Sequence, residues 1–212
     1  MDKNLLLIGG GGHCESILDT LYQIGEFNQI GIVDNEKEMD AKILGAPVVG
    51  RDSDLKKLSP KYNYAFISIG SIGNTKIRRK FYSYIEDLGF KIPNIIDPSA
   101  NVTQSSILGN GIFIGKNAVV NCATTIGDAA IINTGAILEH NCYVGKFSHI
   151  SPGATVCGNV YIGSDVHVGA NSTIIQGKKI EDKIIIGAGS VVTKNLLKAG
   201  TYLGVPARKY ED

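Results

Sequence analysis

One rule governs the second half of the chain: every sixth residue is Ile, Leu or Val, seventeen times in succession from Ile96 to Val192. An α-helix repeats about every 3.6 residues and a strand every two, so neither produces a period of six. A triangular parallel β-helix does, because each hexad forms one flat side and one corner, and three hexads complete a coil. The rule predicts a β-helix of nearly six coils with these side chains on its axis.

Two further positions of the hexad are restricted. The residue after the aliphatic one is glycine seven times, at Gly109, Gly115, Gly127, Gly145, Gly163, Gly169 and Gly187. We interpret these glycines as corner residues with positive φ. The fifth position is usually small, as at Ala118, Ala136 and Ala154, and is expected to pack beside the aliphatic side chain.

The first part of the chain follows a different pattern. Apolar runs at 5–8, 30–33 and 64–69 read as strands, and the stretch 74–88 has the spacing of an amphipathic helix. Strands that alternate with helices predict a small parallel, Rossmann-like α/β sheet. We therefore expect two domains, an α/β domain over residues 1–92 and a β-helix domain with a C-terminal tail over residues 93–212.

Charge and composition exclude several classes of partner. Lys and Arg number 21 against 20 Asp and Glu, so the net charge of +1 gives no basic surface for nucleic acid or an anionic membrane. The apolar run near the N-terminus is too short for a membrane span or a signal sequence, which favours a cytoplasmic protein. The four cysteines lack the spacing of a zinc site, and we expect reduced thiols, three of them small core residues.

Residues 18 apart should stack on adjacent coils, about 4.8 Å from each other. One such ladder is Pro152, Ala170 and Ala188. Small residues in a row would leave a shallow groove for a slim extended ligand such as pantetheine. The alternative is that corners simply require small residues, and the ladder alone does not decide between the two.

Two arrangements of histidines are of chemical interest. His140 falls at or near a corner, where an imidazole, which titrates near neutral pH, can take a proton from a bound nucleophile. His149 and His167 are 18 residues apart and should stack, as in a metal site. Such a site needs a closely spaced pair of histidines plus a third, and the intervals of 9 and 18 residues found here do not supply it, so we predict no metal. A single histidine is more often structural than catalytic, so a catalytic role for His140 has to be supported by the residues around it.

The glycine run Gly9-Gly10-Gly11-Gly12 has two interpretations. With Asp34 about twenty residues further on, it is similar to a dinucleotide-binding fingerprint, although Cys14 stands where glycine or alanine is expected. The alternative is phosphate binding by backbone N–H groups at a helix N-terminus. An NAD-dependent oxidoreductase remains possible on the first interpretation, but a second nucleotide-binding half is missing.

The hexads and the ending Gly204-Val205-Pro206-Ala207-Arg208 resemble the hexapeptide-repeat acyltransferases, which implies a left-handed β-helix. The run from Ile132 to Gly153 is similar to the subfamily of sialic acid O-acetyltransferases (NeuD) and UDP-amino-sugar N-acetyltransferases (PglD). The resemblance implies an acetyl-CoA-dependent acetyltransferase that N-acetylates a UDP-4-amino-sugar in bacterial glycan (polysaccharide) biosynthesis. Alternatives are O-acetylation of a sialic acid and a catalytically silent β-helix scaffold.

The resemblance also assigns roles to residues. It implies that His140 is the general base. Sugar-nucleotide members often have an acid after the base that strengthens it; here the residue is Asn141, which can orient the ring. Glu139 is another candidate for strengthening the base. The resemblance implies acetyl-CoA contacts for His149, Ala170 and Ala188. Acceptor contacts are implied for Gly11, Gly12, His13, Asp34, Asn35 and Gly70. It further implies a homotrimer with active sites between subunits.

Overall fold

The structure, a computed structural model, describes residues 3–211. The chain forms two compact units. Of the described residues, the first contains 3–70 and 76–98, and the second contains 71–75 and 99–211. The short segment Ser71–Thr75 therefore belongs with the β-helix, although it lies within the sequence of the α/β unit.

The first unit is built on a five-stranded sheet with the order β3-β4-β2-β1-β5. Its parallel strands are β1 (Asn4–Ile8), β2 (Gln29–Val33), β4 (Ala46–Gly50) and β5 (Tyr64–Ile67), and β3 (Lys42–Ile43) runs antiparallel to β4. Leu5, Leu6, Leu7 and Ile8 of β1, which lies between β2 and β5, are completely buried. This explains why β1 reads as a continuous apolar run rather than an alternating one.

Within the described residues, the first unit contains three α-helices. They are α1 (Gly12–Ile24), the single turn α2 (Leu55–Leu58) and α3 (Lys76–Asp87), which lies where a helix was predicted over 74–88. The helix α1 ends at Gly25, whose φ of 66° requires a residue that tolerates the left-handed region. None of the helices in the described part of the chain is long and apolar enough to cross a membrane.

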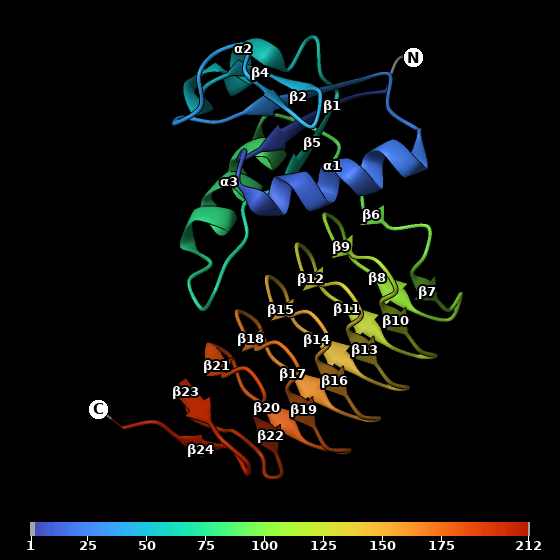
Figure 1. Ribbon diagram of the computed structural model, residues 1–212, viewed down its shortest axis with the longest axis vertical. Coiled ribbons are helices and arrows are strands. Elements are labelled where there is room, and N and C mark those ends of the chain that lie inside the picture. Colours follow the sequence, from blue (N-terminus) through green and yellow to red (C-terminus); the bar gives the residue numbers. More distant parts are fainter. Residues whose placement is uncertain (1–2, 212) are drawn as a thin grey trace. The chain divides into compact units, whose positions relative to one another are not determined.

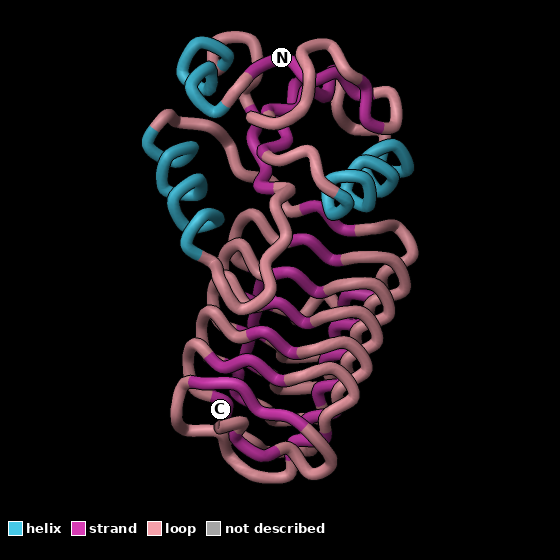
Figure 2. Tube along the Cα trace, turned by 60° about the vertical axis from the view of Figure 1, so that its left-hand side comes forward, coloured by secondary structure: helices cyan, strands magenta, loops and turns pink. Residues whose placement is uncertain are grey.

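The second unit is a parallel β-helix with three faces, and its strands stack as ladders (Figures 1 and 2). The first face consists of β7 (Asn101–Val102), β10 (Val119–Val120), β13 (Ile137–Leu138), β16 (Thr155–Val156), β19 (Thr173–Ile174) and β22 (Val191–Val192). The second consists of β8 (Ile107–Leu108), β11 (Thr125–Ile126), β14 (Tyr143–Val144), β17 (Tyr161–Ile162) and β20 (Lys179–Ile180). The third contains β9 (Phe113–Ile114), β12 (Ile131–Ile132), β15 (His149–Ile150), β18 (His167–Val168), β21 (Ile184–Ile186), β23 (Gly200–Leu203) and β24 (Arg208–Lys209).

The aliphatic residues of the repeat form the core, as predicted. From Ile114 to Val192 each of them has at most 1% of its surface exposed. Each face pairs residues that are 18 apart, for example His149 with His167 on β15 and β18. The first three aliphatic residues, Ile96, Val102 and Leu108, are only half-buried. Because fully burying such a side chain contributes about 1.5–3 kcal/mol, the repeat accounts for much of the stability of this unit.

The interpretation of the repeat glycines as positive-φ corners is wrong. The left-handed residues lie two positions later, at every sixth residue from Gly111 to Gly189. Glycine after the aliphatic residue is instead required by close packing between coils. A Cβ on Gly145 would lie 2.5 Å from the carbonyl carbon of Gly163, and one on Gly169 would lie 2.5 Å from the backbone nitrogen of Ala188.

The prediction that three cysteines fill the core is also wrong. Cys14 and Cys142 are buried, but Cys157 is half-buried and Cys122 is exposed. Cys122 lies one coil before His140, as the period requires, since its carbonyl accepts a hydrogen bond from the Asn141 N–H at 2.9 Å.

Candidate active site

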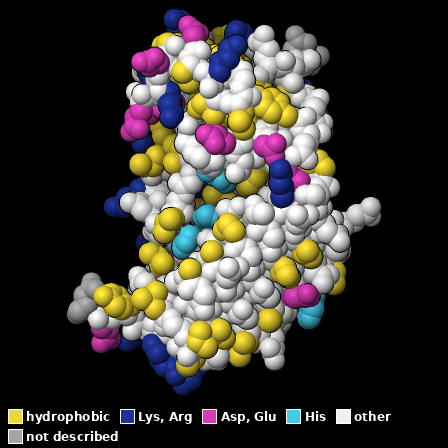
Figure 3. Space-filling model, in the orientation of Figure 1, with side chains coloured by type: hydrophobic (Ala, Val, Ile, Leu, Met, Phe, Trp, Pro, Cys, Tyr) yellow, Lys and Arg dark blue, Asp and Glu magenta, His cyan; other side chains and the backbone are white. Residues whose placement is uncertain are grey.

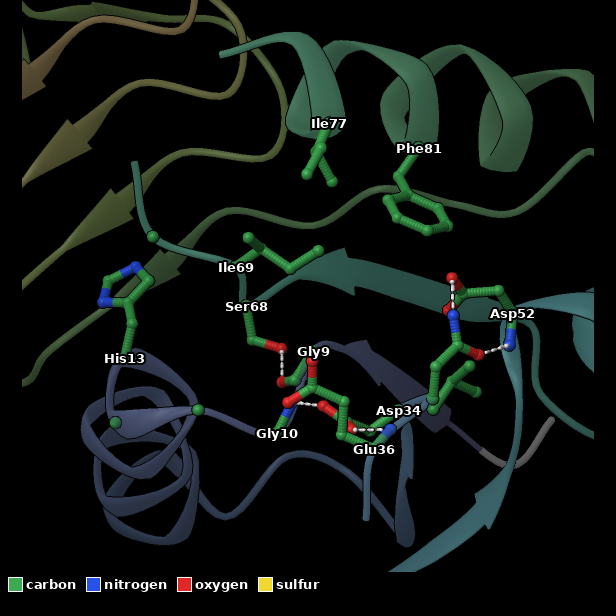
Figure 4. Close-up of a pocket in the computed structure, with 15 residues that line it drawn as sticks. Gly9, Gly10, His13, Asp34, Glu36, Asp52, Ser68, Ile69, Ile77 and Phe81 are labelled. Carbon is green, nitrogen blue, oxygen red and sulfur yellow. Dashed lines mark hydrogen bonds between the residues drawn. The ribbon is translucent and has the colours of Figure 1, made fainter. Parts of the chain in front are cut away.

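The first unit contains a cavity of about 490 Å³ at the carboxyl ends of β1, β2 and β5 (Figure 4). The strand order reverses here, because the chain leaves β1 for β2 on one side and later returns to β5 on the other. Ligands of open α/β sheets bind at such a reversal point. All six residues expected to contact the acceptor line this cavity: Gly11, Gly12, His13, Asp34, Asn35 and Gly70.

Asp34 holds the glycine turn in shape. Its Oδ2 accepts the Gly10 N–H at 2.7 Å, and its Oδ1 accepts the N–H groups of Glu36 and Lys37 at 2.8 and 3.0 Å. Burial acts to raise the pKa of the Asp34 carboxyl, but these three hydrogen bonds outweigh burial and lower the pKa. Asp34 therefore remains ionised and organises the turn, with little acceptor capacity left for a ligand.

The helix α1 begins at the floor of this cavity with an open N-terminus. Its N-cap residue, Gly11, provides no side chain to cap the first N–H groups. A Cβ on Gly11 or Gly12 would meet nothing within 4 Å, so packing does not explain either glycine. Both glycines line the cavity, so free N–H groups of this first turn are available to bind an anion such as a phosphate.

Several cavity residues were not identified from the sequence. Asp52, in the turn before α2, makes two hydrogen bonds with Asn35: Asn35 Nδ2 donates to Asp52 Oδ2 at 2.6 Å, and the Asp52 N–H donates to Asn35 Oδ1 at 3.1 Å. Ile77 and Phe81 extend from α3 over the cavity (Figure 4). These residues come from distant parts of the sequence, and no local motif marks them.

The β-helix carries a second cavity, of about 430 Å³, on its third face. His149, Ala170 and Ala188, the three residues expected to contact acetyl-CoA, all line it, together with Pro152 of the same ladder. Histidine and hydrophobic side chains are seen beside each other on this face of the unit (Figure 3). Its lining is mostly apolar, which suits a pantetheine chain.

His149 is held in one tautomer. Its Nδ1 lies 3.0 Å from the carbonyl oxygen of Ser71, which can only accept, so Nδ1 carries the proton. Its Nε2 lies 3.2 Å from Nδ2 of Asn133, whose own Oδ1 accepts the Thr134 N–H. His149 is therefore a neutral, oriented wall residue.

The segment Ser71–Thr75 also closes one side of this second cavity. Ile72 lines the cavity and is 78% exposed. Gly73 lies so close to Ile185 that a Cβ would be 2.3 Å from Ile185 Cδ1, and Thr75 hydrogen-bonds Asp165. The role of this segment could not be found from the hexad pattern, because it lies outside the repeat.

His167 stacks on His149 as the 18-residue spacing predicts. Their ring centroids are 5.1 Å apart and the rings are nearly perpendicular. His167 Nε2 lies 3.4 Å from Ser151 Oγ, and burial lowers the pKa of His167, which favours the neutral ring. Within residues 3–211 no three His, Cys, Asp or Glu side chains cluster as metal ligands would.

His140 is exposed at the corner that follows β13. Its Nδ1 lies 3.0 Å from the side-chain amide of Asn141, while Glu139 instead accepts a hydrogen bond from Asn121, one coil back, at 2.9 Å. Asn141 is thus the residue that orients the ring. A Cβ on Gly158 would lie 2.5 Å from both Cε1 and Nε2 of His140, so the ring rests directly on this glycine.

His140 is not among the residues that line either cavity. It follows β13, whereas the second cavity is built on β15, β18 and β21 and on the corner that follows them. A single copy of the β-helix therefore presents the imidazole and the apolar cavity at different corners.

Comparison with known proteins agrees with both units. The family model described as the PglD N-terminal domain matches residues 4–85. Models of the bacterial transferase hexapeptide and of the hexapeptide repeat of succinyl-transferase match residues 141–176 and 159–194.

Two solved structures are similar over almost the whole chain. The acetyltransferase domain of PglB from Neisseria gonorrhoeae, in complex with acetyl coenzyme A, is 31% identical with a TM-score of 0.93, over 99% of this chain and 100% of that one. PerB from Caulobacter crescentus, in complex with CoA and GDP-perosamine, is 34% identical with a TM-score of 0.89, over 98% and 97%.

The α/β unit, the left-handed hexapeptide β-helix and these likenesses define the class of the protein: it is a hexapeptide-repeat acetyltransferase. Within that class, the chain belongs to the PglD family.

Proposed function

We propose that this protein transfers the acetyl group of acetyl-CoA to the amino group of a nucleotide-linked amino sugar. One observation carries the proposal: the nine residues expected to bind acceptor and donor fall into two cavities, six in the first and three in the second. PerB, which is 34% identical to this chain, binds CoA and GDP-perosamine. Such a reaction is a step of polysaccharide biosynthesis. It takes place in the cytoplasm, because acetyl-CoA and sugar nucleotides are available there.

The first cavity suits the nucleotide part of the acceptor. The open N-terminus of α1 offers N–H groups and the positive end of the helix dipole to a diphosphate. Asp34 fixes the turn that leads into the helix, and Gly11 and Gly12 leave the approach clear. Gly70 and His13 lie next to each other at the cavity wall, where a sugar attached to the diphosphate can extend.

The second cavity suits the pantetheine arm of acetyl-CoA. Ala170 and Ala188 keep the groove shallow, and Ile72, Pro152 and the edge of neutral His149 provide an apolar wall. The coenzyme supplies an activated acetyl group, because a thioester carbonyl is readily attacked by an amine.

His140 acts as the general base. As the acceptor nitrogen bonds to the acetyl carbon and the C–S bond breaks, His140 Nε2 takes a proton from the nitrogen and returns it to the departing sulfur. Asn141 Nδ2 lies 3.0 Å from His140 Nδ1. A half-turn of the amide places Oδ1 there instead; Nδ1 then carries the ring proton and Nε2 can accept a proton from the acceptor nitrogen. In that orientation Asn141 selects the tautomer in which Nε2 is the base.

The active form is a homotrimer with its active sites between subunits. His140 and the second cavity lie at different corners of one β-helix, so a second copy is needed to bring them together. The outer surface of the first face offers an uncharged ladder of branched side chains, among them Val119, Ile137 and Val191, that a neighbouring subunit can cover.

The proposal is tested by measuring release of the CoA thiol with three acceptors: a nucleotide-linked amino sugar, the same sugar without its nucleotide, and sialic acid. We expect turnover with the first alone, and a loss of roughly 10²–10⁴-fold in His140→Ala. Turnover with sialic acid alone would indicate O-acetylation instead. Activity that is indifferent to His140→Ala, or absent with every acceptor, would contradict the proposed function.

A further inference from the structure

We propose that the Asn35–Asp52 pair reads the nucleobase of the acceptor and that it selects guanine over uracil, cytosine and adenine. This inference rests on the proposed function, because it requires a nucleotide-linked acceptor in the first cavity. It adds Asp52 as a residue that determines substrate specificity.

The pair is joined side chain to side chain and has a defined set of unused hydrogen-bonding groups. Asn35 and Asp52 are joined by two hydrogen bonds, of 2.6 and 3.1 Å. In the described part of the chain, Asp52 Oδ1 accepts no hydrogen bond, and one N–H of the Asn35 amide remains available. The pair therefore presents one donor beside a carboxylate that still accepts.

The opposite side of the cavity is apolar. Phe81 and Ile77 extend from α3, and Ile69 follows β5, so that hydrophobic side chains face the pair across the cavity (Figure 4). Phe81 is 8% exposed, which means that its ring is fixed by packing and offers the cavity a defined apolar surface. A flat base stacks favourably on an aromatic ring while its edge forms hydrogen bonds.

Charge also indicates which part of the acceptor lies against Asp52. The cavity lining contains Asp34, Glu36 and Asp52 but no Lys or Arg. A diphosphate next to Asp52 would be repelled, and it has a better site at the N-terminus of α1. The carboxylate of Asp52 is thus suited to the neutral N–H groups of a base.

Guanine matches the pair at three points. Its O6 accepts, and its N1–H and N2–H groups donate side by side, so the Asn35 N–H can bind O6 while the Asp52 carboxylate accepts both N–H groups. Uracil has one N–H between two carbonyls, and its second carbonyl would face the carboxylate. Cytosine and adenine each offer one matching donor and one acceptor. A bidentate match of this kind discriminates between bases by about 1–3 kcal/mol, or roughly 5- to 150-fold.

The test is isothermal titration of the full-length protein with GDP, UDP, CDP and ADP. We expect GDP to bind at least about tenfold more tightly than UDP, CDP or ADP. In Asp52→Asn the preference should fall to less than about threefold, because an amide cannot accept both N–H groups. Asp54→Asn is the matched control: Asp54 lies on the same turn and accepts the Arg51 N–H at 2.8 Å, but it does not line the cavity. It should keep the preference for GDP.

The outcomes separate this inference from the proposed function. UDP binding as tightly as GDP, or a preference that persists in Asp52→Asn, would overturn the selection of guanine but leave a nucleotide-linked acceptor in place. Failure of all four nucleotides to bind, in a protein that still releases CoA thiol with a free sugar, would overturn both.

Discussion

Replacing Gly158 by alanine should displace the base without unfolding the β-helix. The new Cβ would lie 2.5 Å from Cε1 and Nε2 of His140. Ordinary contact begins at 3.4 Å, so the ring has to withdraw by about 0.9 Å. A misplacement of about 1 Å in a catalytic group costs about 100-fold in rate, or about 2.7 kcal/mol of activation free energy. We expect the kcat of Gly158→Ala to fall by this factor while KM for acetyl-CoA stays within about twofold.

The assay compares steady-state kinetics of four proteins: wild type, Gly158→Ala, His140→Ala and the double variant. If Gly158 acts through His140, the alanine has no further effect in the His140→Ala background. Gly89→Ala serves as a control for stability, since its φ of 77° makes alanine cost about 1–2 kcal/mol of folding free energy while its Cβ meets nothing. Its kcat should not change. Full activity in Gly158→Ala, or an equal loss with and without His140, would refute the reasoning.

Three further predictions concern the remaining parts of the site. Asn141→Asp should raise kcat several-fold, because a carboxylate stabilises the imidazolium, whereas Asn141→Ala should lower kcat about tenfold. Both are measured at saturating substrates, and rates equal to that of the wild type would contradict the orienting role of Asn141. Ala170→Leu should raise KM for acetyl-CoA at least about tenfold by filling the second cavity, and should leave nucleotide affinity in the calorimeter unchanged. His167 has a lowered pKa in the folded state, so its contribution to stability is fully present above about pH 6.5 and is lost as the pH falls towards the folded pKa. His167→Gln should therefore show a smaller drop in Tm between pH 7.5 and 5 than wild type, and an equal drop would contradict this assignment.

The β-helix could be predicted in detail because its rule is local. A period of six fixes both the face and the coil of every residue, so the stacking of His149 on His167 and the ladder of Ala170 and Ala188 follow from counting. The period does not reveal why a given residue occupies its place. For this reason the prediction of positive φ at the repeat glycines is wrong. Gly145 and Gly169 are glycines because the backbone of the next coil, 18 or 19 residues further on, lies too close for a Cβ.

The residues of the first cavity could be predicted only in part. Its glycine turn and Asp34 could be found, because the spacing from a strand end to a helix start is itself a local signal. Asp52 and Phe81 could not, since they reach the cavity from a turn and a helix whose placement depends on the packing of the sheet. Charged and aromatic residues of this kind are common in loops and amphipathic helices, and only the folded chain distinguishes those that face a ligand.

The corner geometry favours certain residue types at the position that follows the base. Each residue three positions after an aliphatic one, from Gly111 to Gly189, has positive φ, and Asn141 is one of them with φ of 58°. Asn and Asp tolerate this region better than other side chains with a Cβ, and both can hydrogen-bond an adjacent imidazole. The backbone therefore admits either an aspartate or the asparagine found here. Exchange between the two alters the strength of the base while the corner keeps its shape, so catalytic power at His140 can change with little effect on folding.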